Sequence, residues 1–479
     1  MTVLLPFLVN AALNFVLGLL IALFLGPEAF GLYAIGAALV VLVNTATLDW
    51  LKLSAVRFYT AQTRESDPSI RATLDLLFAA VALVLCLLLV LALLAGFDGG
   101  LPRALLAAAV LAAIGAGWFD YHGAIARARF LDAAYARLIF VRAVIVLVLM
   151  VGGAWLTRDP ATVLLAGLVG TIASVLSART RLSDGPVSFA GARKELARDF
   201  LRYALPLVAG NAVYSLIPLL NRSLLAEAHG FAESGYFSLA SDIGLRLFPM
   251  LATMLEIVLL REVIRLDETR GRNAARRRIA GNLVLVLAVV LPAALGFWLV
   301  LPAFEALLVP AAFRGHFAHF MAPLLPGFAA IALFQAAIYP VFLLEKRTLI
   351  AAVVAVAGLG VNLAWLWAPG AATSLRFAAA QSAGFVAVLL ITGFVALRSL
   401  PKGLPLRDMA CVLLAGLAMA LAIWPLRGSL PPLPELVLQI GLGGLVYGAV
   451  ILACDVARWR TGLRLRWLAR KASLARKPR

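Results

Sequence analysis

Charged side chains are scarce in this chain. Only 14% of its 479 residues are Asp, Glu, Lys or Arg, against about a quarter in a typical soluble domain. Hydrophobic residues make up 63%, and the mean hydropathy is +0.99. This composition excludes a cytosolic enzyme and an intrinsically disordered chain, because both classes carry far more charge.

Cysteine and histidine are also rare. The three cysteines, Cys86, Cys411 and Cys454, lie in apolar runs without metal-ligand spacing, which excludes a disulfide scaffold. The four histidines are scattered, and the sequence has neither a phosphate-binding loop nor a defensible Ser, His and Asp set. We therefore expect no cofactor, no metal ion and no enzymatic activity.

Apolar runs of membrane-spanning length fill most of the chain. A helix of about 20 apolar residues crosses the hydrocarbon core of a bilayer. Fourteen such runs lie at 3–25, 30–50, 73–97, 104–126, 138–157, 161–178, 203–226, 235–260, 279–301, 321–344, 349–368, 374–396, 409–426 and 434–456. The sequence predicts an all-α polytopic membrane protein with about 14 transmembrane helices. The first run has no basic segment before it, so we do not expect a cleaved signal peptide.

Lysine and arginine are distributed unevenly between the connectors. Alternate connectors, counted together with the tail 457–479, hold 35 of the 42 Lys and Arg residues, and the opposite connectors hold 5. Because cytoplasmic connectors are enriched in positive residues, both termini are expected in the cytoplasm. The net charge of +18 then indicates contact with anionic lipid rather than nucleic acid. The excess of arginine, alanine and leucine favours a bacterial source, and hence the bacterial cytoplasmic (inner) membrane.

A weak internal repeat relates the two halves of the chain. The stretch 6–10 resembles 206–211, and the hairpin 26–34 resembles 229–238. The offset of about 200 residues spans six runs, so both copies would have the same orientation. We therefore expect an amino-terminal lobe at 1–202 and a carboxy-terminal lobe at 203–398. Two accessory helices at 399–456 and a basic cytoplasmic tail at 457–479 would follow them.

Several short motifs resemble one family of membrane transporters. They lie at 26–33, 49–51, 57–59, 221–225, 235–240, 339–347 and 361–363. These stretches are similar to the polysaccharide transport, or O-antigen flippase, branch of the multidrug/oligosaccharidyl-lipid/polysaccharide flippase superfamily. An Asp-Arg pair is usual late in the seventh span of that family, whereas Asn221 precedes Arg222 here.

The resemblance implies both a fold and a function. The fold would be two six-helix lobes around a central lumen that opens to one side at a time. The cargo would be undecaprenyl-pyrophosphate-linked oligosaccharide units of O-antigen, capsule or exopolysaccharide, moved from the inner to the outer leaflet. Partners implied by the resemblance are the lipid-linked oligosaccharide and the machinery for polysaccharide polymerisation and chain length.

Ionisable residues inside the spans are the first candidates for a site, since they are costly in a membrane. Arg222 and Arg246 could hold a pyrophosphate through paired donors. Alternatively, Arg246 could pair with Asp242 one helical turn away, and Arg222 could extend to the membrane surface. Arg142 and Arg376, near expected span ends, would also extend to the surface.

Carboxylates and amides give two further sets of candidates. Asp49, Asp120 and Asp242 are candidates for ion coupling, with Asp75 and Glu256 as weaker ones, because burial favours protonation of a carboxylate. Amides could bind sugar hydroxyls or hold helices together. They are Asn10, Asn14, Asn211, Gln335, Asn362 and Gln381, and Asn44 is a further amide of this set.

Three other functions remain open. An ion-coupled multidrug exporter would share the fold, but we would expect carboxylates and aromatics rather than arginines in its lumen. A peptidoglycan lipid-precursor flippase would use the same chemistry. A membrane-embedded polymerase or glycosyltransferase would need a large outside catalytic loop, and the longest outside connector, 303–320, has under twenty residues.

Overall fold

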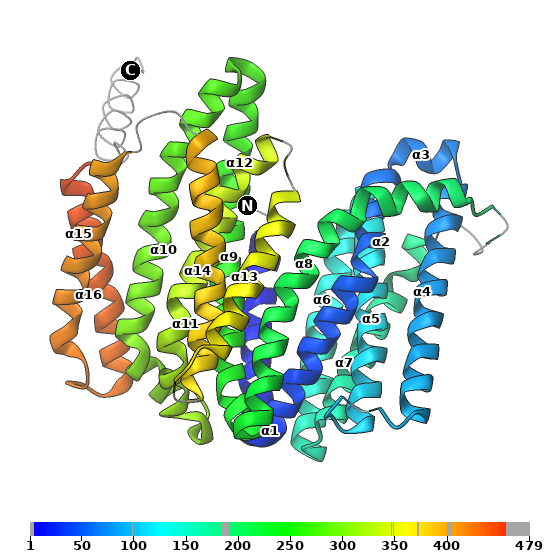
Figure 1. The fold of residues 1–479 in the computed structure, drawn as a ribbon, viewed down its shortest axis with the longest axis horizontal. Helices are drawn as coiled ribbons and strands as arrows, with labels where there is room; N and C mark the ends of the chain where they lie inside the picture. The colour runs from blue at the N-terminus through cyan, green and yellow to red at the C-terminus, as the bar shows by residue number, and fades with distance from the viewer. Residues whose placement is uncertain are drawn as a thin grey trace, which may run out of the picture. The chain divides into compact units, whose positions relative to one another are not determined.

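The chain folds into a series of long helices (Figure 1). The computed structural model describes residues 4–97, 99–183, 189, 191–345, 347, 349–370, 373–399 and 405–456, and every regular element within them is helical. Thirteen of the described helices are long and apolar enough to cross a membrane. They are α1 (Leu4–Thr47), α4 (Ser69–Leu94), α5 (Arg103–Ala128), α6 (Asp132–Thr157), α7 (Pro160–Leu182), α8 (Lys194–His229), α9 (Phe231–Arg270), α10 (Arg272–Leu308), the segment α11 to α12 (His316–Leu344), α13 (Leu349–Trp367), α14 (Leu375–Ser399), α15 (Leu406–Ile423) and α16 (Pro432–Ala453).

The first of these helices accounts for two of the expected spans. Gly26 has φ 73° and ψ 174°, so α1 is two helices joined at a bend, which Figure 1 shows as the turn of the blue helix. Glycine adopts such a backbone without a Cβ clash, and Pro27 can start the second helix because its missing N–H would have no partner there. Counted this way, the 14 apolar runs correspond one to one with the membrane-length helices described.

Some connectors also contain short helices. The connector expected at 51–72 holds most of α2 (Asp49–Phe58), α3 (Ala61–Ser66) and the start of α4. Thr60 begins α3 as a capping residue, since its side chain accepts a hydrogen bond from the backbone N–H of Thr63 at 3.2 Å. The 3₁₀ turn η1 (Ala311–Phe313) lies in the connector 303–320, which is expected outside, and a second 3₁₀ turn, η3 (Trp424–Leu426), ends the expected span 409–426.

The tenth expected span is interrupted by a wider turn. Between α11 (His316–Leu333) and α12 (Tyr339–Leu344) the chain forms the π-helical turn η2 (Phe334–Ile338). Pro340 lies just beyond this turn and cannot donate a backbone hydrogen bond, and its ring crowds the carbonyl four residues earlier. A π-turn at this place accommodates the proline without ending the span.

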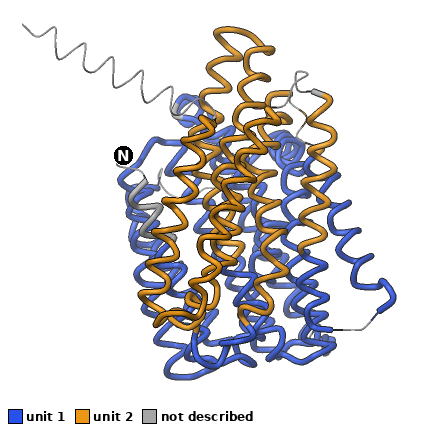
Figure 2. Tube along the Cα trace, turned by 90° about the vertical axis from the view of Figure 1, so that its left-hand side faces the viewer, with its two compact units in different colours: residues 1–243, 310–316, 351–381 blue, residues 244–309, 317–350, 382–479 orange. Residues whose placement is uncertain are grey.

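The described chain divides into two compact units, which Figure 2 colours separately. Unit 1 contains 1–243, 310–316 and 351–381, and unit 2 contains 244–309, 317–350 and 382–479. Leu51, Leu74 and Phe200 are fully buried in the core of unit 1, and Val412 and Ala415 in that of unit 2. The division of the chain into lobes at 202 and 398 stays a prediction.

Candidate functional site

Arg222 is a buried cation on α8. Only 3% of its surface is exposed. Its guanidinium pairs with Asp242 of α9, and its Nη1 donates a hydrogen bond to the backbone oxygen of Ala34 in α1 at 3.1 Å. An unpaired charge would be costly at such a place, so the carboxylate is what makes a buried arginine tolerable here.

Amide and hydroxyl groups extend this ion pair to two more helices. Asn362 of α13 donates to Oδ1 of Asn221 at 3.4 Å, and Gln381 of α14 donates to Oγ of Ser241 at 3.1 Å. Asn221 and Ser241 are the chain neighbours of the two ionic residues, and all four of these polar side chains are fully buried. The Arg222 network is therefore a buried polar link between four helices, made of Asn221, Arg222, Ser241, Asp242, Asn362 and Gln381.

The network keeps some hydrogen-bonding capacity. Nε of Arg222, Oδ1 of Asn362 and Oε1 of Gln381 are buried and have no hydrogen-bond partner among the described residues. A buried polar atom left unpaired costs roughly 1–3 kcal/mol. The free guanidinium N–H suits a phosphate oxygen, and the free amide oxygens suit hydroxyl donors such as those of sugars.

Arg246 lies one turn beyond Asp242 on α9. Its side chain is exposed, unlike that of Arg222. The sequence left open a pair between Asp242 and Arg246, whereas the ion pair described for Asp242 is with Arg222. Arg222 competes for this carboxylate from a neighbouring helix, a contact that sequence spacing does not reveal.

A second group of charges gathers two of the predicted carboxylates. Nζ of Lys52 lies 2.7 Å from Oδ1 of Asp49 and 3.7 Å from Oδ2 of Asp120. Asn44 of α1 donates to the same Oδ2 of Asp120 at 3.2 Å. Lys52, which sequence reasoning did not single out, thus joins the carboxylate of α5 to that of α2.

A third group surrounds Asp75 on α4. Arg71 donates to this carboxylate at 2.9 Å, and the hydroxyl of Tyr121 on α5 donates to it at 2.6 Å. The guanidinium of Arg71 also lies over the ring of Tyr121, 5.4 Å from its centroid. Sequence analysis did not single out Arg71, although its i,i+4 spacing to Asp75 is a signal that could have indicated the pair.

Arg142 occupies a different place from the one expected. Because α6 begins at Asp132, Arg142 lies ten residues into the helix rather than at its end. Its guanidinium stacks over the ring of Phe119 on α5, 4.3 Å from the centroid. The aromatic face provides part of the stabilisation that surface water would give a terminal arginine.

Unit 2 holds a polar contact at the π-turn. Gln335 donates from Nε2 to Thr253 at 2.9 Å and to Glu256 at 3.4 Å, and both partners lie on α9. The irregular turn of η2 thus contributes a side chain that links two long helices. π-turns of this kind are frequent at functional sites.

The remaining predicted amides lie elsewhere in the chain. Asn14 and Asn211 are exposed on α1 and α8. Asn10 lies in the first part of α1, where side chains are outside the described residues. The basic tail 457–479 also lies outside them.

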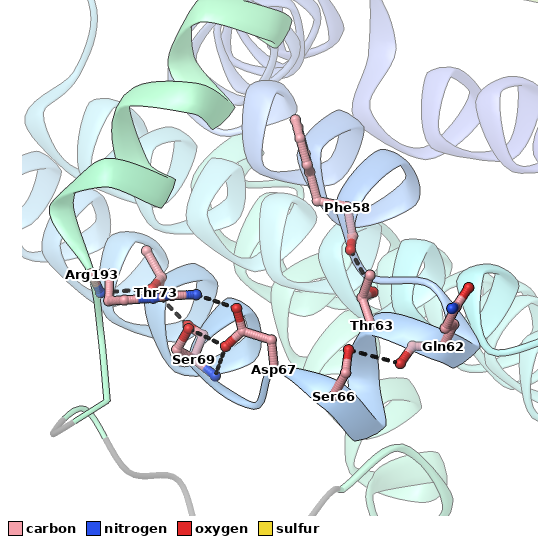
Figure 3. A network of polar contacts seen from close by, with 8 residues as sticks. All are labelled: Phe58, Gln62, Thr63, Ser66, Asp67, Ser69, Thr73 and Arg193. Carbon is pink, nitrogen blue, oxygen red and sulfur yellow. Dashed lines mark hydrogen bonds and ion pairs between the residues drawn. The ribbon is translucent and has the colours of Figure 1, made fainter.

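The connector before α4 is tied to the segment that precedes α8 (Figure 3). Asp67 accepts hydrogen bonds from the backbone and hydroxyl of Ser69 and forms an ion pair with Arg193. The backbone N–H of Arg193 donates to Oγ1 of Thr73 at 3.0 Å. The Ser69 hydrogen bond and the Arg193 charge hold the pKa of Asp67 below its ordinary value of 3.8.

No group of three or more His, Cys, Asp or Glu residues in the described part of the chain is placed to hold a metal ion. The polar groups of the site are instead arginines, carboxylates and amides on membrane-length helices. This chemistry suits an anionic, hydroxyl-rich ligand.

Comparison with known proteins identifies the family of the chain and its fold. The sequence profile of the family described as polysaccharide biosynthesis protein matches residues 3–260. A structure described as the lipid II flippase MurJ in an inward closed conformation superposes with a TM-score of 0.74 at 14% identity, covering 94% of this chain and 98% of that one. An inward-facing multidrug resistance MATE family transporter of the MOP superfamily superposes with a TM-score of 0.57 at 14% identity, covering 81% and 94%.

No curated protein sequence matches the chain. The family profile covers more than half of the sequence, and the two structures share its all-helical fold. The chain therefore belongs to the polysaccharide biosynthesis protein family, with the fold of the multidrug/oligosaccharidyl-lipid/polysaccharide flippase superfamily.

Proposed function

We propose that this protein is a flippase for undecaprenyl-pyrophosphate-linked oligosaccharide repeat units of O-antigen, capsule or exopolysaccharide type. It moves them from the inner to the outer leaflet of the bacterial cytoplasmic membrane. Membership of the polysaccharide biosynthesis family carries this proposal. The likeness to a structure described as a lipid II flippase over 94% of the chain supports a lipid-linked cargo.

The arginines provide the chemistry for the cargo head group. Arg222 has a buried N–H without a described partner, and Arg246 is an exposed cation on the next helix. We propose that both contact the pyrophosphate and that the amides Asn10, Asn14, Asn211, Gln335, Asn362 and Gln381 contact sugar hydroxyls. Since Asp242 now holds Arg222, the phosphate must compete with this carboxylate.

That competition provides a means of coupling to an ion gradient. Protonation of Asp242 removes its charge and releases Arg222 for the cargo, and Asp49 and Asp120 form a second carboxylate pair around Lys52. In this proposal the lobes 1–202 and 203–398 alternate around a lumen while the lipid tail stays in the bilayer. The protein performs no enzymatic reaction and uses no cofactor.

The charge distribution supports the orientation. With 35 of 42 Lys and Arg residues in one alternating set of connectors and the tail, we place both termini in the cytoplasm. The basic tail then contacts anionic lipid, and the polymerase and chain-length machinery act on the cargo once it is outside.

The test is deletion of the gene, followed by measurement of surface polysaccharide and of lipid-linked repeat units on the inner leaflet. Complementation uses wild type, Arg246→Gln and Arg265→Gln, the last as a control because Arg265 lies on the same helix with a side chain 67% exposed. We expect loss of surface polysaccharide and accumulation of the lipid-linked unit. Wild type and Arg265→Gln restore export, and Arg246→Gln does not, although all three reach the membrane in equal amounts.

Other outcomes identify the alternatives. Unchanged polysaccharide with increased sensitivity to cationic drugs indicates a multidrug exporter, the function named for the MATE structure of the same fold. Accumulation of the peptidoglycan lipid precursor indicates a flippase of the kind named for the MurJ structure. Either result contradicts the proposed cargo.

A further inference from the structure

Two bends in the chain repeat the same unusual backbone. Gly26 has φ 73° and ψ 174°, and Gly230, which separates α8 from α9, has φ 91° and ψ 163°. The bends are 204 residues apart, and the same offset relates Gly31 to Gly235. A Cβ on either bend glycine would meet nothing within 4 Å, so the positive φ, and not crowding, explains glycine at both.

The helices that follow the two bends contact each other reciprocally. A Cβ added to Gly31 of α1 would overlap the backbone oxygen of Phe231, and one added to Gly235 of α9 would overlap that of Pro27. Phe231 and Pro27 are themselves 204 residues apart. Each repeat thus places its glycine against the carbonyl of the other, as a local two-fold axis requires.

An aromatic cluster includes the chain neighbours of both glycines, Phe30 and Tyr236. Phe313 of η1 packs edge-on against Phe30 of α1 and Tyr236 of α9, with centroids 5.6 Å apart in both pairs. His316 stacks on Tyr236 at 3.9 Å. Phe313 and His316 belong to the connector 303–320, which is expected outside the membrane. Phe313 contacts an aromatic residue of each repeat and so bridges them.

Arg222 of the ion pair with Asp242 bonds to residues that are close in sequence to Gly31 and Gly235. The backbone oxygen of Ala34, one turn beyond Gly31, accepts a hydrogen bond from Arg222. The hydroxyl of Ser234, the residue before Gly235, donates to the backbone oxygen of Arg222 at 2.9 Å. At the offset of 204, Arg222 corresponds to Gly18 and Asp242 to Ala38. The glycine contact is symmetric, whereas the ion pair beside it exists in one repeat only.

We propose that the Gly31–Gly235 contact is the outer gate of this transporter and that the Arg222–Asp242 pair is its latch. The inference rests on the proposed function for its inside-outside orientation. The repeats separate at this contact when the protein opens outward. The two glycines have no side chains that must repack, and Phe313 then gives up one of its two ring contacts. The phosphate or proton that separates Asp242 from Arg222 frees the guanidinium that holds α1 through Ala34.

The test measures access to the position of Ser238, which lies about one turn after Gly235 and is fully buried. A single cysteine is introduced as Ser238→Cys after Cys86, Cys411 and Cys454 are replaced by serine. Intact cells are then treated with a membrane-impermeant maleimide.

The variants tested in this background change the gate or spare it. Gly31→Ala and Gly235→Ala each prevent the close backbone approach. Gly152→Ala is the matched control, because a Cβ there would meet nothing within 4 Å and its backbone is helical. Asp242→Asn opens the latch and adds no bulk, so the test does not depend on the alanine variants alone.

We expect slow labelling of the introduced cysteine in the parent and in Gly152→Ala. Labelling should be about tenfold faster in Gly31→Ala and Gly235→Ala, and Asp242→Asn should also accelerate it. Labelling is compared only among variants that show the same amount in the membrane and the same elution profile in detergent.

Parent-like labelling in well-folded Gly235→Ala and Asp242→Asn protein overturns the gate, and so does equal acceleration in Gly152→Ala. The labelling rate is measured without any readout of cargo export. The gate and the cargo can therefore fail separately. If the gate variants label fast while the deletion strain exports polysaccharide normally, the cargo assignment is contradicted and the gate is supported.

Discussion

At the scale of single residues, Arg222 shows how a charge is accommodated among apolar helices. Its identity as a candidate followed from the sequence alone, because an ionisable group in an apolar run is costly and therefore informative. Its partner did not follow. The sequence offered Arg246 for Asp242, and the structure shows that Arg222 of α8 pairs with that carboxylate of α9.

Removing the carboxylate is expected to destabilise the protein. Asp242→Asn leaves the guanidinium of Arg222, whose side chain is 4% exposed, without its counter-charge. We expect a loss of about 3 kcal/mol, in the range for breaking a buried pair from one side. The thermal unfolding midpoint in detergent measures it, and Asp242→Glu should recover part of the loss.

Glu262→Gln is the control for this prediction. Its partner Arg265 lies on the same helix as Asp242, with a side chain 67% exposed, so the change should cost less than about 1 kcal/mol. Equal midpoints for Asp242→Asn and Glu262→Gln would show that the Arg222 pair does not stabilise the fold.

At the scale of elements, the long helices were predictable because hydrophobic length is a property of the sequence. The 14 apolar runs correspond to described helices, with α1 counted on both sides of Gly26. Helix ends were less predictable. Polar first turns, as in α6, extend the helix beyond its apolar run, and so Arg142 lies inside α6 instead of at its end.

The contribution of Asp67 to the stability of the protein should decrease in acid. The hydroxyl of Ser69 and the charge of Arg193 lower the pKa of this carboxyl. Its contribution to stability is therefore fully present above the ordinary value of 3.8 and is lost as the pH falls through the lower folded-state pKa. We expect Asp67→Asn to have a lower unfolding midpoint than wild type at pH 7, with the difference shrinking as the pH falls below about 4.

Unfolding of both proteins in the same detergent between pH 7 and pH 3 measures this difference. Ser69→Ala should reduce it, because the hydroxyl makes the principal contact with the carboxylate. A difference that stays constant down to pH 3 would contradict the contribution of the ionised Asp67.

At the scale of the whole molecule, the alternation of positive charge predicts which connectors face the cytoplasm. Ser66 lies in a connector of the predicted cytoplasmic set, Ser429 lies in an opposite connector, and both are exposed. In a cysteine-free background, an impermeant maleimide should label Ser429→Cys in intact cells and Ser66→Cys only after the cells are opened. The reverse pattern would invert the topology and place the glycine contact at the cytoplasmic end.

The sequence by itself determined the class of protein, the number of membrane-length segments, the family and most of the polar residues of the candidate site. Hydrophobic length and the scarcity of charge act locally along the chain, so they can be read without a fold. Only the tertiary structure decided which charges meet and how closely the repeats approach. The pairing of Arg222 with Asp242 and the reciprocal contact of Gly31 with Gly235 join residues 20 and 204 positions apart, and such contacts depend on how helices pack against one another.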